Sequence, residues 1–394
     1  MIILQACAIY MQLDSDLRMR RFDILYVSRH IENGCIDLFE EAVMLNKSVG
    51  STQAPASRIR FWSTPHRLIL TIMWLITTAV MVTMLWLGVR ETGRYVEVRY
   101  IVPAGYVAAL IWYLIRSGPS LNQLPELQPL LFPRRRFGAW IPVLGIALLL
   151  YLTATSNEGL FLFFLVTIVA TIWILIAWRR QIRLRSVVQG LGLALIIYFP
   201  AFTLAKNDSI SELIFFFLLV FVAPMYIAGG LLVDHTNLGD VQLLAKRYRK
   251  ALESFIWGCL LFIPLGLADA TAGARDVTSS WTWMNEWWMP FVTPLSSAIA
   301  EETWFRLLLL SLCYFLLRPA FPRRPAVPMI IAVLFNGITF GLLHELTMYG
   351  FLVTGLLYGL PMAAVFARRD WEHAVGAHYM INMIPSMMVY LETL

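Results

Sequence analysis

The sequence contains little charge. Only 14% of its 394 residues are Asp, Glu, Lys or Arg, whereas 59% are hydrophobic. About one quarter of the residues in a soluble domain are charged, so this composition excludes an ordinary soluble protein and indicates a polytopic membrane protein. The net charge of +6 is small, and the basic residues form short clusters between apolar runs. That pattern is typical of cytoplasmic loops and argues against nucleic-acid binding.

Cysteine is scarce as well. Cys7 and Cys35 precede the first apolar run, and Cys259 and Cys313 lie inside predicted spans, so a disulfide framework is not expected. The sequence has no CxxC, CxxH or HExxH spacing, so it offers no recognisable zinc motif. We expect no metal and no cofactor. The chain also lacks internal repeats of 20–50 residues and low-complexity tracts, which excludes a solenoid or an array.

Apolar runs of membrane length, about 17 to 25 residues each, are abundant. They predict an all-α, polytopic transmembrane helical bundle that is embedded in the lipid bilayer. Residues 1–64 are polar and are interpreted as an N-terminal cytoplasmic extension. Residues 65–280 form N-terminal transmembrane helices without a recognisable role, and residues 281–394 contain the polar residues that could carry chemistry. We predict eleven spans, at residues 67–89, 100–116, 138–155, 159–178, 187–205, 210–233, 252–268, 288–317, 327–346, 350–367 and 372–392.

The basic clusters predict the orientation of these spans. Every second loop is rich in Arg and Lys, with the single exception of the loop after the first span. Basic loops stay on the cytoplasmic side, so we expect the N-terminus inside and the C-terminus outside. The predicted location is the cell membrane, plasma or inner. The clearest clusters are RRR at 134–136, RRQIRLR at 179–185 and KRYRK at 246–250.

The segment SSAIAEETWFRLLLL, residues 296–310, places three charges inside an apolar span. A charge at the bilayer centre costs roughly 2.5 to 3.5 kcal/mol on insertion scales. Glu302 and Arg306 are four residues apart, so they can pair on one helix face. Glu301 points about 100° away and faces a different neighbour. We therefore expect Glu302 to be a structural ion held by Arg306, and Glu301 to be a candidate general base.

Two later helices bring further polar residues. FGLLH places His344 four residues after Phe340, and HYMIN places His378 and Asn382 on one helix face. Each feature has an ordinary structural explanation: an ion-pair clamp, a histidine bonded to a carbonyl, or an asparagine bonded across helices. Their joint occurrence in four consecutive spans favours one shared site.

In this order, EETWFR, FGLLH and HYMIN read as EExxxR, FxxxH and HxxxN. The pattern resembles the CAAX-protease and bacteriocin-processing (CPBP) family, the type II CAAX prenyl endopeptidase-like intramembrane proteases. The resemblance covers roughly residues 280–394. It implies an intramembrane glutamic endopeptidase that does not depend on a metal. Its substrate would be a peptide or protein, either prenylated at a C-terminal CAAX sequence or a leader or signalling peptide.

The resemblance also implies a role for each catalytic residue. Glu301 would activate the water, and Glu302 with Arg306 would orient the site. His344 would hold or polarise the water. The remaining two residues would stabilise the oxyanion of the tetrahedral intermediate, a task suited to fixed donors in a dry site. These two are His378 and Asn382.

Three other functions compete with this one. Two glutamates and two histidines could ligate zinc in a metal-dependent intramembrane protease, although Arg306 would then stand beside the ion. A transporter or proton relay also buries such residues, but it should show broken helices or an inverted repeat. A non-catalytic membrane scaffold, or an immunity or assembly factor, is the third alternative, because members of the family serve in such roles.

Overall fold

A computed structural model of the chain describes residues 65–86, 96–117, 144–146, 148, 157–204, 209–272, 286–322, 324–344 and 347–393. Every regular element in these ranges is helical, and the described residues contain no strand. The predicted fold class, an all-α membrane bundle, is confirmed. The predicted extension at 1–64 lies outside the described residues, as does most of the predicted span at 138–155.

The described residues form α-helices, π-helices and short 3₁₀ turns. The elements η8 and η10 are π-helices, and η6 and η9 are short 3₁₀ turns. The elements are α3 (Pro65–Trp86), α4 (Val96–Ser117), α6 (Asn157–Ala177), η6 (Arg179–Gln181), α7 (Leu184–Leu204), α8 (Ser209–Thr236), α9 (Tyr248–Ala272), α11 (Met289–Glu302), η8 (Thr303–Leu310), α12 (Ser311–Leu317), η9 (Arg318–Ala320), α13 (Ala326–His344), η10 (Gly350–Gly359), α14 (Leu360–Arg368) and α15 (Trp371–Thr393).

Among the described residues, 6 helices are long and apolar enough to cross a membrane. They confirm the predicted spans that begin at residues 67, 100, 252, 288, 327 and 350 as apolar helices of membrane length. The predicted spans at 159–178 and 187–205 correspond to two shorter apolar helices, Leu162–Ala177 and Leu184–Tyr198. The total of eleven spans stays a prediction, as does their orientation.

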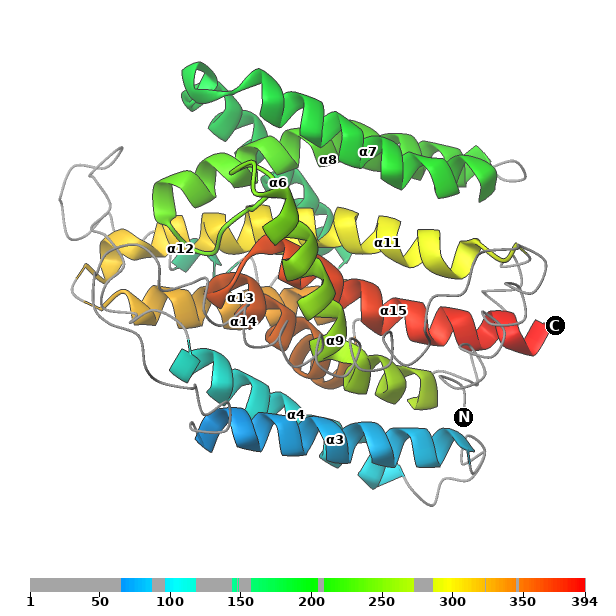
Figure 1. Ribbon diagram of the computed structural model, residues 1–394. Helices are drawn as coiled ribbons and strands as arrows, with labels where there is room; N and C mark the ends of the chain where they lie inside the picture. The colour runs from blue at the N-terminus through cyan, green and yellow to red at the C-terminus, as the bar shows by residue number, and fades with distance from the viewer. Residues whose placement is uncertain are drawn as a thin grey trace, which may run out of the picture. The chain divides into compact units, whose positions relative to one another are not determined.

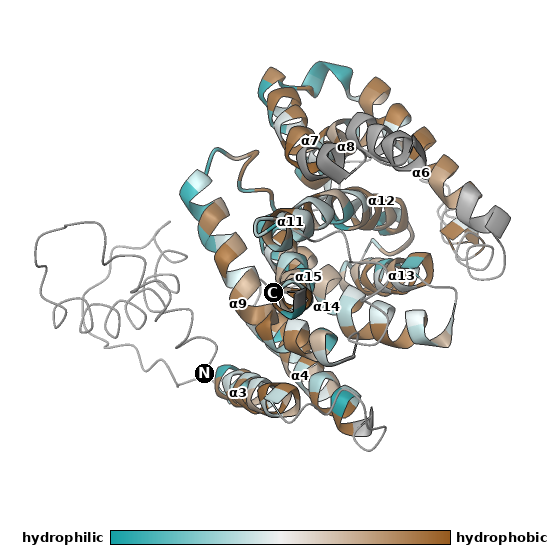
Figure 2. Cartoon of the chain, turned by 90° about the vertical axis from the view of Figure 1, so that its right-hand side faces the viewer, coloured by the Kyte–Doolittle hydropathy of each residue, from teal (hydrophilic) through white to brown (hydrophobic). Residues whose placement is uncertain are grey.

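Helix α15 packs most extensively against α9 and also contacts α11, α14 and η8. Two glycines make the α9–α15 contact close. A Cβ atom on Gly258 would overlap the carbonyl of His373, and one on Gly376 would overlap the carbonyl of Phe255. The two backbones therefore touch, as small residues allow at helix interfaces in membranes. In Figures 1 and 2, α7 and α8 lie on one side of the α11–α15 group, and α3 and α4 lie on the other.

The N-terminus of α15 is held by buried carboxylates. Asp370 caps the helix, since its Oδ1 accepts a hydrogen bond from the backbone N–H of His373 at 2.9 Å. Its Oδ2 accepts another from the Ser254 hydroxyl of α9 at 2.8 Å. Glu372 accepts hydrogen bonds from two backbone N–H groups of the α8–α9 loop, at 2.8 and 3.1 Å. These bonds fix the position of α15 along its axis and so the height of every side chain it carries.

Burial differs strongly between the helices. In the most apolar stretch of α3, 22% of the residues are buried, compared with 72% in both Met289–Ala320 and Gly350–Arg368. Hydrophobic residues therefore cover much of the surface of α3, as the colouring in Figure 2 shows. The most buried part of the helical bundle therefore lies among the last helices, where the predicted site residues are found.

Candidate active site

The two adjacent glutamates occupy the last turn of α11, and directly after them the helix changes from an α-helix to a π-helix. Glu302 Oε2 lies 3.2 Å from Arg306 Nε, and both side chains have no exposed surface. The pair predicted from the four-residue spacing is therefore present. Because both groups are fully buried, each is the main compensating charge for the other.

Arg306 belongs to the π-helix η8, which begins at Thr303, immediately after the glutamates. π-helical turns are rare and often occur at functional sites. Asn336 of α13 supports this stretch, since its side-chain amide donates a 2.7 Å hydrogen bond to the Phe305 carbonyl. Sequence reasoning missed Asn336. The available signal was its spacing, because residues 336, 340 and 344 lie on one face of α13.

Arg306 also connects three helical segments. Its Nη2 donates a hydrogen bond to the Gly359 carbonyl, at the end of η10, over 3.3 Å. Its guanidinium carbon lies 4.2 Å from the centre of the Phe340 ring of α13. A cation over an aromatic face is stabilised by the quadrupole of the ring. Arg306 thus links η8, η10 and α13 beside the two glutamates.

Phe340 lies at the centre of the cluster. Its buried ring is 4.4 Å from the His344 ring and 5.7 Å from the His378 ring, centre to centre. Together with the Arg306 contact, this gives Phe340 three neighbours among the predicted site residues. Phe340 carries no chemistry of its own, but its shape sets the distance between these polar side chains.

Both histidines approach Glu301. The Nε2 of His344 is 3.4 Å from Glu301 Oε2, and the Nε2 of His378 is 3.7 Å from the same oxygen. On the opposite side of the ring, His378 Nδ1 lies 2.7 Å from Glu302 Oε1. The two glutamates therefore share His378 and differ in their other partner, which is Arg306 for Glu302 and His344 for Glu301.

The hydrogen bonds restrict the histidine tautomers. His344 Nδ1 lies 2.7 Å from the Phe340 carbonyl, which can only accept, so Nδ1 must carry a proton. In neutral His344 the Nε2 atom is then a free acceptor that faces Glu301. The same reasoning applies to His378 when Glu302 is ionised. Each imidazole therefore presents Nε2 to the Glu301 carboxylate.

Exposure separates the residues into two layers. The side chains of Glu301 and His344 are 28% and 41% exposed, whereas His378 is 4% exposed and Glu302 is fully buried. Among the described residues, no hydrogen-bond donor reaches Glu301 Oε2 with good geometry. Glu301 and His344 therefore form the more exposed layer of the cluster, although Glu301 Oε2 itself is buried, and the charge-paired layer lies behind them.

Asn382 lies one helical turn beyond His378, but its contact is a different one. Its side-chain amide donates a hydrogen bond to the Ser297 hydroxyl at 3.2 Å. Ser297 stands one turn before Glu301 on α11, so Asn382 reaches the glutamate helix at a neighbouring turn. The structure thus brings five of the six predicted residues into one cluster and leaves Asn382 at its edge. Ser297 was also missed, although its spacing from Glu301 could have identified it.

The cluster contains two carboxylates and two imidazoles, which are side chains of the kind that ligate metals. In the described part of the chain, no three His, Cys, Asp or Glu side chains are placed to hold a metal ion together. The Arg306 guanidinium stands beside the glutamates, where a cation would otherwise bind. The residues present do not form a recognisable metal site, and the predicted metal independence calls for a chelation experiment.

The fold and the cluster define the class: a helical integral membrane protein with ionisable residues buried between its last helices. Residues 283–384 match the family model described as Rce1-like, type II CAAX prenyl endopeptidase. The match confirms, over that segment, the resemblance predicted from the three motifs, and it contains all six predicted site residues. No match was found among curated proteins or among solved structures.

Proposed function

We propose that residues 281–394 form an intramembrane, metal-independent endopeptidase that hydrolyses a peptide bond near the membrane. The observation that carries this proposal is the position of Glu301. Its side chain is partly exposed, and two imidazoles approach its buried Oε2 atom. A fully buried Glu302–Arg306 pair stands behind it. A partly exposed glutamate side chain that stands beside a fixed, buried ion pair is suited to general-base catalysis.

In the proposed reaction, Glu301 takes a proton from a water molecule as the water oxygen attacks the scissile carbonyl. The carbonyl oxygen becomes the oxyanion of a tetrahedral intermediate. When the C–N bond breaks, the proton on Glu301 passes to the leaving amine, which restores the carboxylate. His344 lies on the accessible side with Glu301, so it can hold the water by donating or accepting at Nε2.

His378 is the proposed oxyanion donor. Glu302 accepts from its Nδ1 and so fixes the ring orientation, as a carboxylate orients a histidine in hydrolytic triads. The Nε2 atom then points toward Glu301 and can donate when it is protonated. Asn382 is the proposed second donor. In this structure its amide donates one hydrogen bond to Ser297, and its second N–H can donate to the oxyanion.

The proposed substrate is a membrane-associated peptide or protein, with a prenylated C-terminal CAAX sequence as the preferred type. The family description supports this choice, and the apolar surroundings of the site suit a substrate that carries a lipid. We further propose that the protein resides in the cell membrane with its N-terminus in the cytoplasm. The alternating basic loops support this orientation.

The experiment uses full-length protein reconstituted in liposomes, with a fluorogenic farnesylated CAAX peptide and the same peptide without the farnesyl group. Wild-type protein should cleave the farnesylated peptide, and Glu301→Gln should not. Comparison of the membrane peptidomes of cells that express the two forms tests other substrates. Identical peptidomes, together with no cleavage of either peptide, would refute the protease and leave the scaffold or immunity factor.

A further inference from the structure

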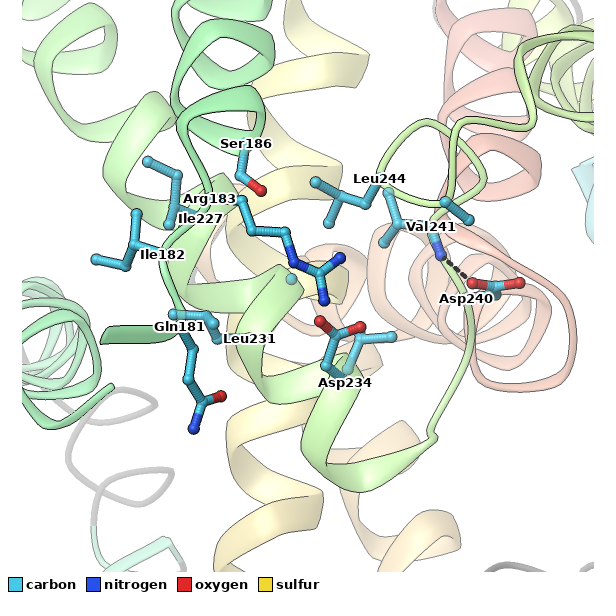
Figure 3. Close-up of a pocket in the computed structure, with 13 residues that line it drawn as sticks. Gln181, Ile182, Arg183, Ser186, Ile227, Leu231, Asp234, Asp240, Val241 and Leu244 are labelled. Carbon is cyan, nitrogen blue, oxygen red and sulfur yellow. Dashed lines mark hydrogen bonds between the residues drawn. The ribbon is translucent and has the colours of Figure 1, made fainter. Parts of the chain in front are cut away.

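A polar cavity lies away from the candidate active site, between η6, the start of α7, the end of α8 and the α8–α9 loop. Its volume is about 160 Å³, and it adjoins a wider open cavity that shares several of its lining residues. Figure 3 shows the polar lining, which consists of Gln181, Arg183, Ser186, Asp234 and Asp240. The lining therefore combines a guanidinium, two carboxylates and neutral donors in one small space.

The charges in this cavity are not all used within the protein. Arg183 points toward Asp234 across the cavity in Figure 3, yet no ion pair joins them among the described residues. Asp240, in contrast, accepts a hydrogen bond from the Val241 backbone and pairs with Arg247 at 3.4 Å. Arg183, which directly precedes α7, and Asp234, on α8, thus place a cation and an anion at the same cavity, where a small ligand that carries both charges could contact them.

Aromatic residues indicate the depth of the cavity in the membrane. The Trp178 ring stacks on His235, with centroids 4.1 Å apart and planes 9° apart. His235 lines the wider cavity, and Trp178 directly precedes the basic 179–185 segment. Tryptophan is enriched at the level of the lipid headgroups. The predicted spans end at residues 178 and 233 and resume at 187, which gives the same level. In the predicted topology the cavity therefore lies at headgroup depth.

An apolar groove on α6 leads toward the same place. Leu165, Val169 and Trp173 lie on one face of this helix and line an open cavity of about 370 Å³. Trp173 is 6.5 Å from Trp178, centre to centre, so the aromatic contacts run from the groove to the polar cavity. A ligand with a polar zwitterionic head and a long apolar chain could occupy both.

We propose that this cavity binds the headgroup of a phospholipid that carries a phosphate and a primary ammonium, as in phosphatidylethanolamine. Arg183 and the Ser186 hydroxyl donate hydrogen bonds to the phosphate oxygens. The ammonium donates to the Asp234 carboxylate, and one acyl chain lies along the α6 groove. A trimethylammonium head has no N–H to donate, and a glycerol head has no cation, so both should bind more weakly. The site is independent of the proposed peptidase.

The test is native mass spectrometry of the detergent-purified full-length chain. Phosphatidylethanolamine, phosphatidylcholine and phosphatidylglycerol are added at equal concentration, with free phosphoethanolamine in a separate arm. We expect the wild-type protein to bind phosphatidylethanolamine roughly tenfold more tightly than the other two lipids, since hydrogen bonds to charged groups are worth a factor of that order. Free phosphoethanolamine should bind more weakly, because it lacks the acyl chain.

Three variants assign the preference to the cavity. Asp234→Asn should remove the preference for ethanolamine over glycerol, and Arg183→Gln should weaken binding of all three lipids. Arg180→Gln is the matched control, because Arg180 is exposed on the same turn but does not line the cavity. Equal binding of the three lipids to wild-type protein would overturn the proposal without any variant. An unchanged preference in Asp234→Asn, or equally tight binding of free phosphoethanolamine, would also overturn it.

Discussion

The two adjacent glutamates should respond differently to the same substitution. Glu301→Gln keeps the size of the side chain and removes the proton acceptor. Loss of a general base costs roughly 10²–10⁴-fold in rate. Glu301 is partly exposed, and its Oε2 atom receives no well-formed hydrogen bond in the described part of the chain, so its replacement should change stability by about 1 kcal/mol or less. This variant should fold, insert and lose activity.

Glu302→Gln removes the negative charge that lies 3.2 Å from a fully buried guanidinium, and it weakens the 2.7 Å contact with His378. Breaking a buried ion pair from one side costs roughly 3–5 kcal/mol, so this variant should lose stability as well as activity. The double change of Glu302→Gln with Arg306→Met removes both charges and should recover part of the loss. Recovery stays incomplete because Arg306 also bonds Gly359 and covers the Phe340 ring.

The assays are thermal stability in detergent and single-turnover peptide cleavage. Glu253→Gln supplies a matched control, because Glu253 forms an exposed pair with Arg249, also four residues apart on one helix. An exposed pair of this kind contributes only about 0.3–0.5 kcal/mol. Equal stability losses for Glu301→Gln and Glu302→Gln would refute the division of roles. Full activity in Glu301→Gln would end the protease proposal.

Further predictions concern the surroundings of the site. Phe340→Ala should lower both stability, by roughly 3–5 kcal/mol, and turnover, whereas Phe340→Leu should keep most stability and still reduce the cleavage rate. Cleavage should survive chelation, and full loss that zinc restores would favour the metal-dependent alternative. Burial raises the pKa of Asp370, but the His373 charge and hydrogen bonds from His373 and Ser254 outweigh it and hold that pKa below its usual range. The stabilisation from Asp370 should thus be complete above its unfolded pKa of about 4 and be lost as the pH falls further. Thermal unfolding of wild type and Asp370→Asn should therefore differ above pH 5 and converge in acid. A reporter fused at Lys246 should read out the cytoplasm, and an external signal there would reverse the predicted topology.

The local parts of the site could be predicted from the sequence, because they depend only on helix geometry. The four-residue spacing of Glu302 and Arg306 was enough to expect their pair, and the structure contains it. Composition likewise led to the all-α membrane bundle. The π-helix at Thr303–Leu310 could not be predicted, since a reading based on 3.6 residues per turn assumes α-helix throughout.

Contacts between helices could not be predicted from the sequence, because they depend on the axial position and rotation of each helix. The position of His378 between the two glutamates follows from the close α9–α15 packing and from the carboxylates that hold the start of α15. Asn336 and Ser297 act through partners on other helices. The local sequence does not indicate those partners. These two residues could therefore be identified only as polar positions that lie four residues from another predicted site position.

The difference in burial between the helices has a consequence for how this sequence can change over evolutionary time. Side chains that face acyl chains need only be apolar, so Leu, Ile, Val and Phe can replace one another there with little effect on fitness. Side chains packed on all sides must also fit by shape. In the most apolar stretch of α3 only 22% of the residues are buried, so α3 should accumulate substitutions quickly. In Met289–Ala320 and Gly350–Arg368 the buried share is 72%, so these segments should change slowly. Both of these tightly packed stretches lie within residues 283–384, the segment that matches the family model. We therefore expect sequence similarity to relatives to persist in the tightly packed helices and to be lost sooner in the helices that face the lipid.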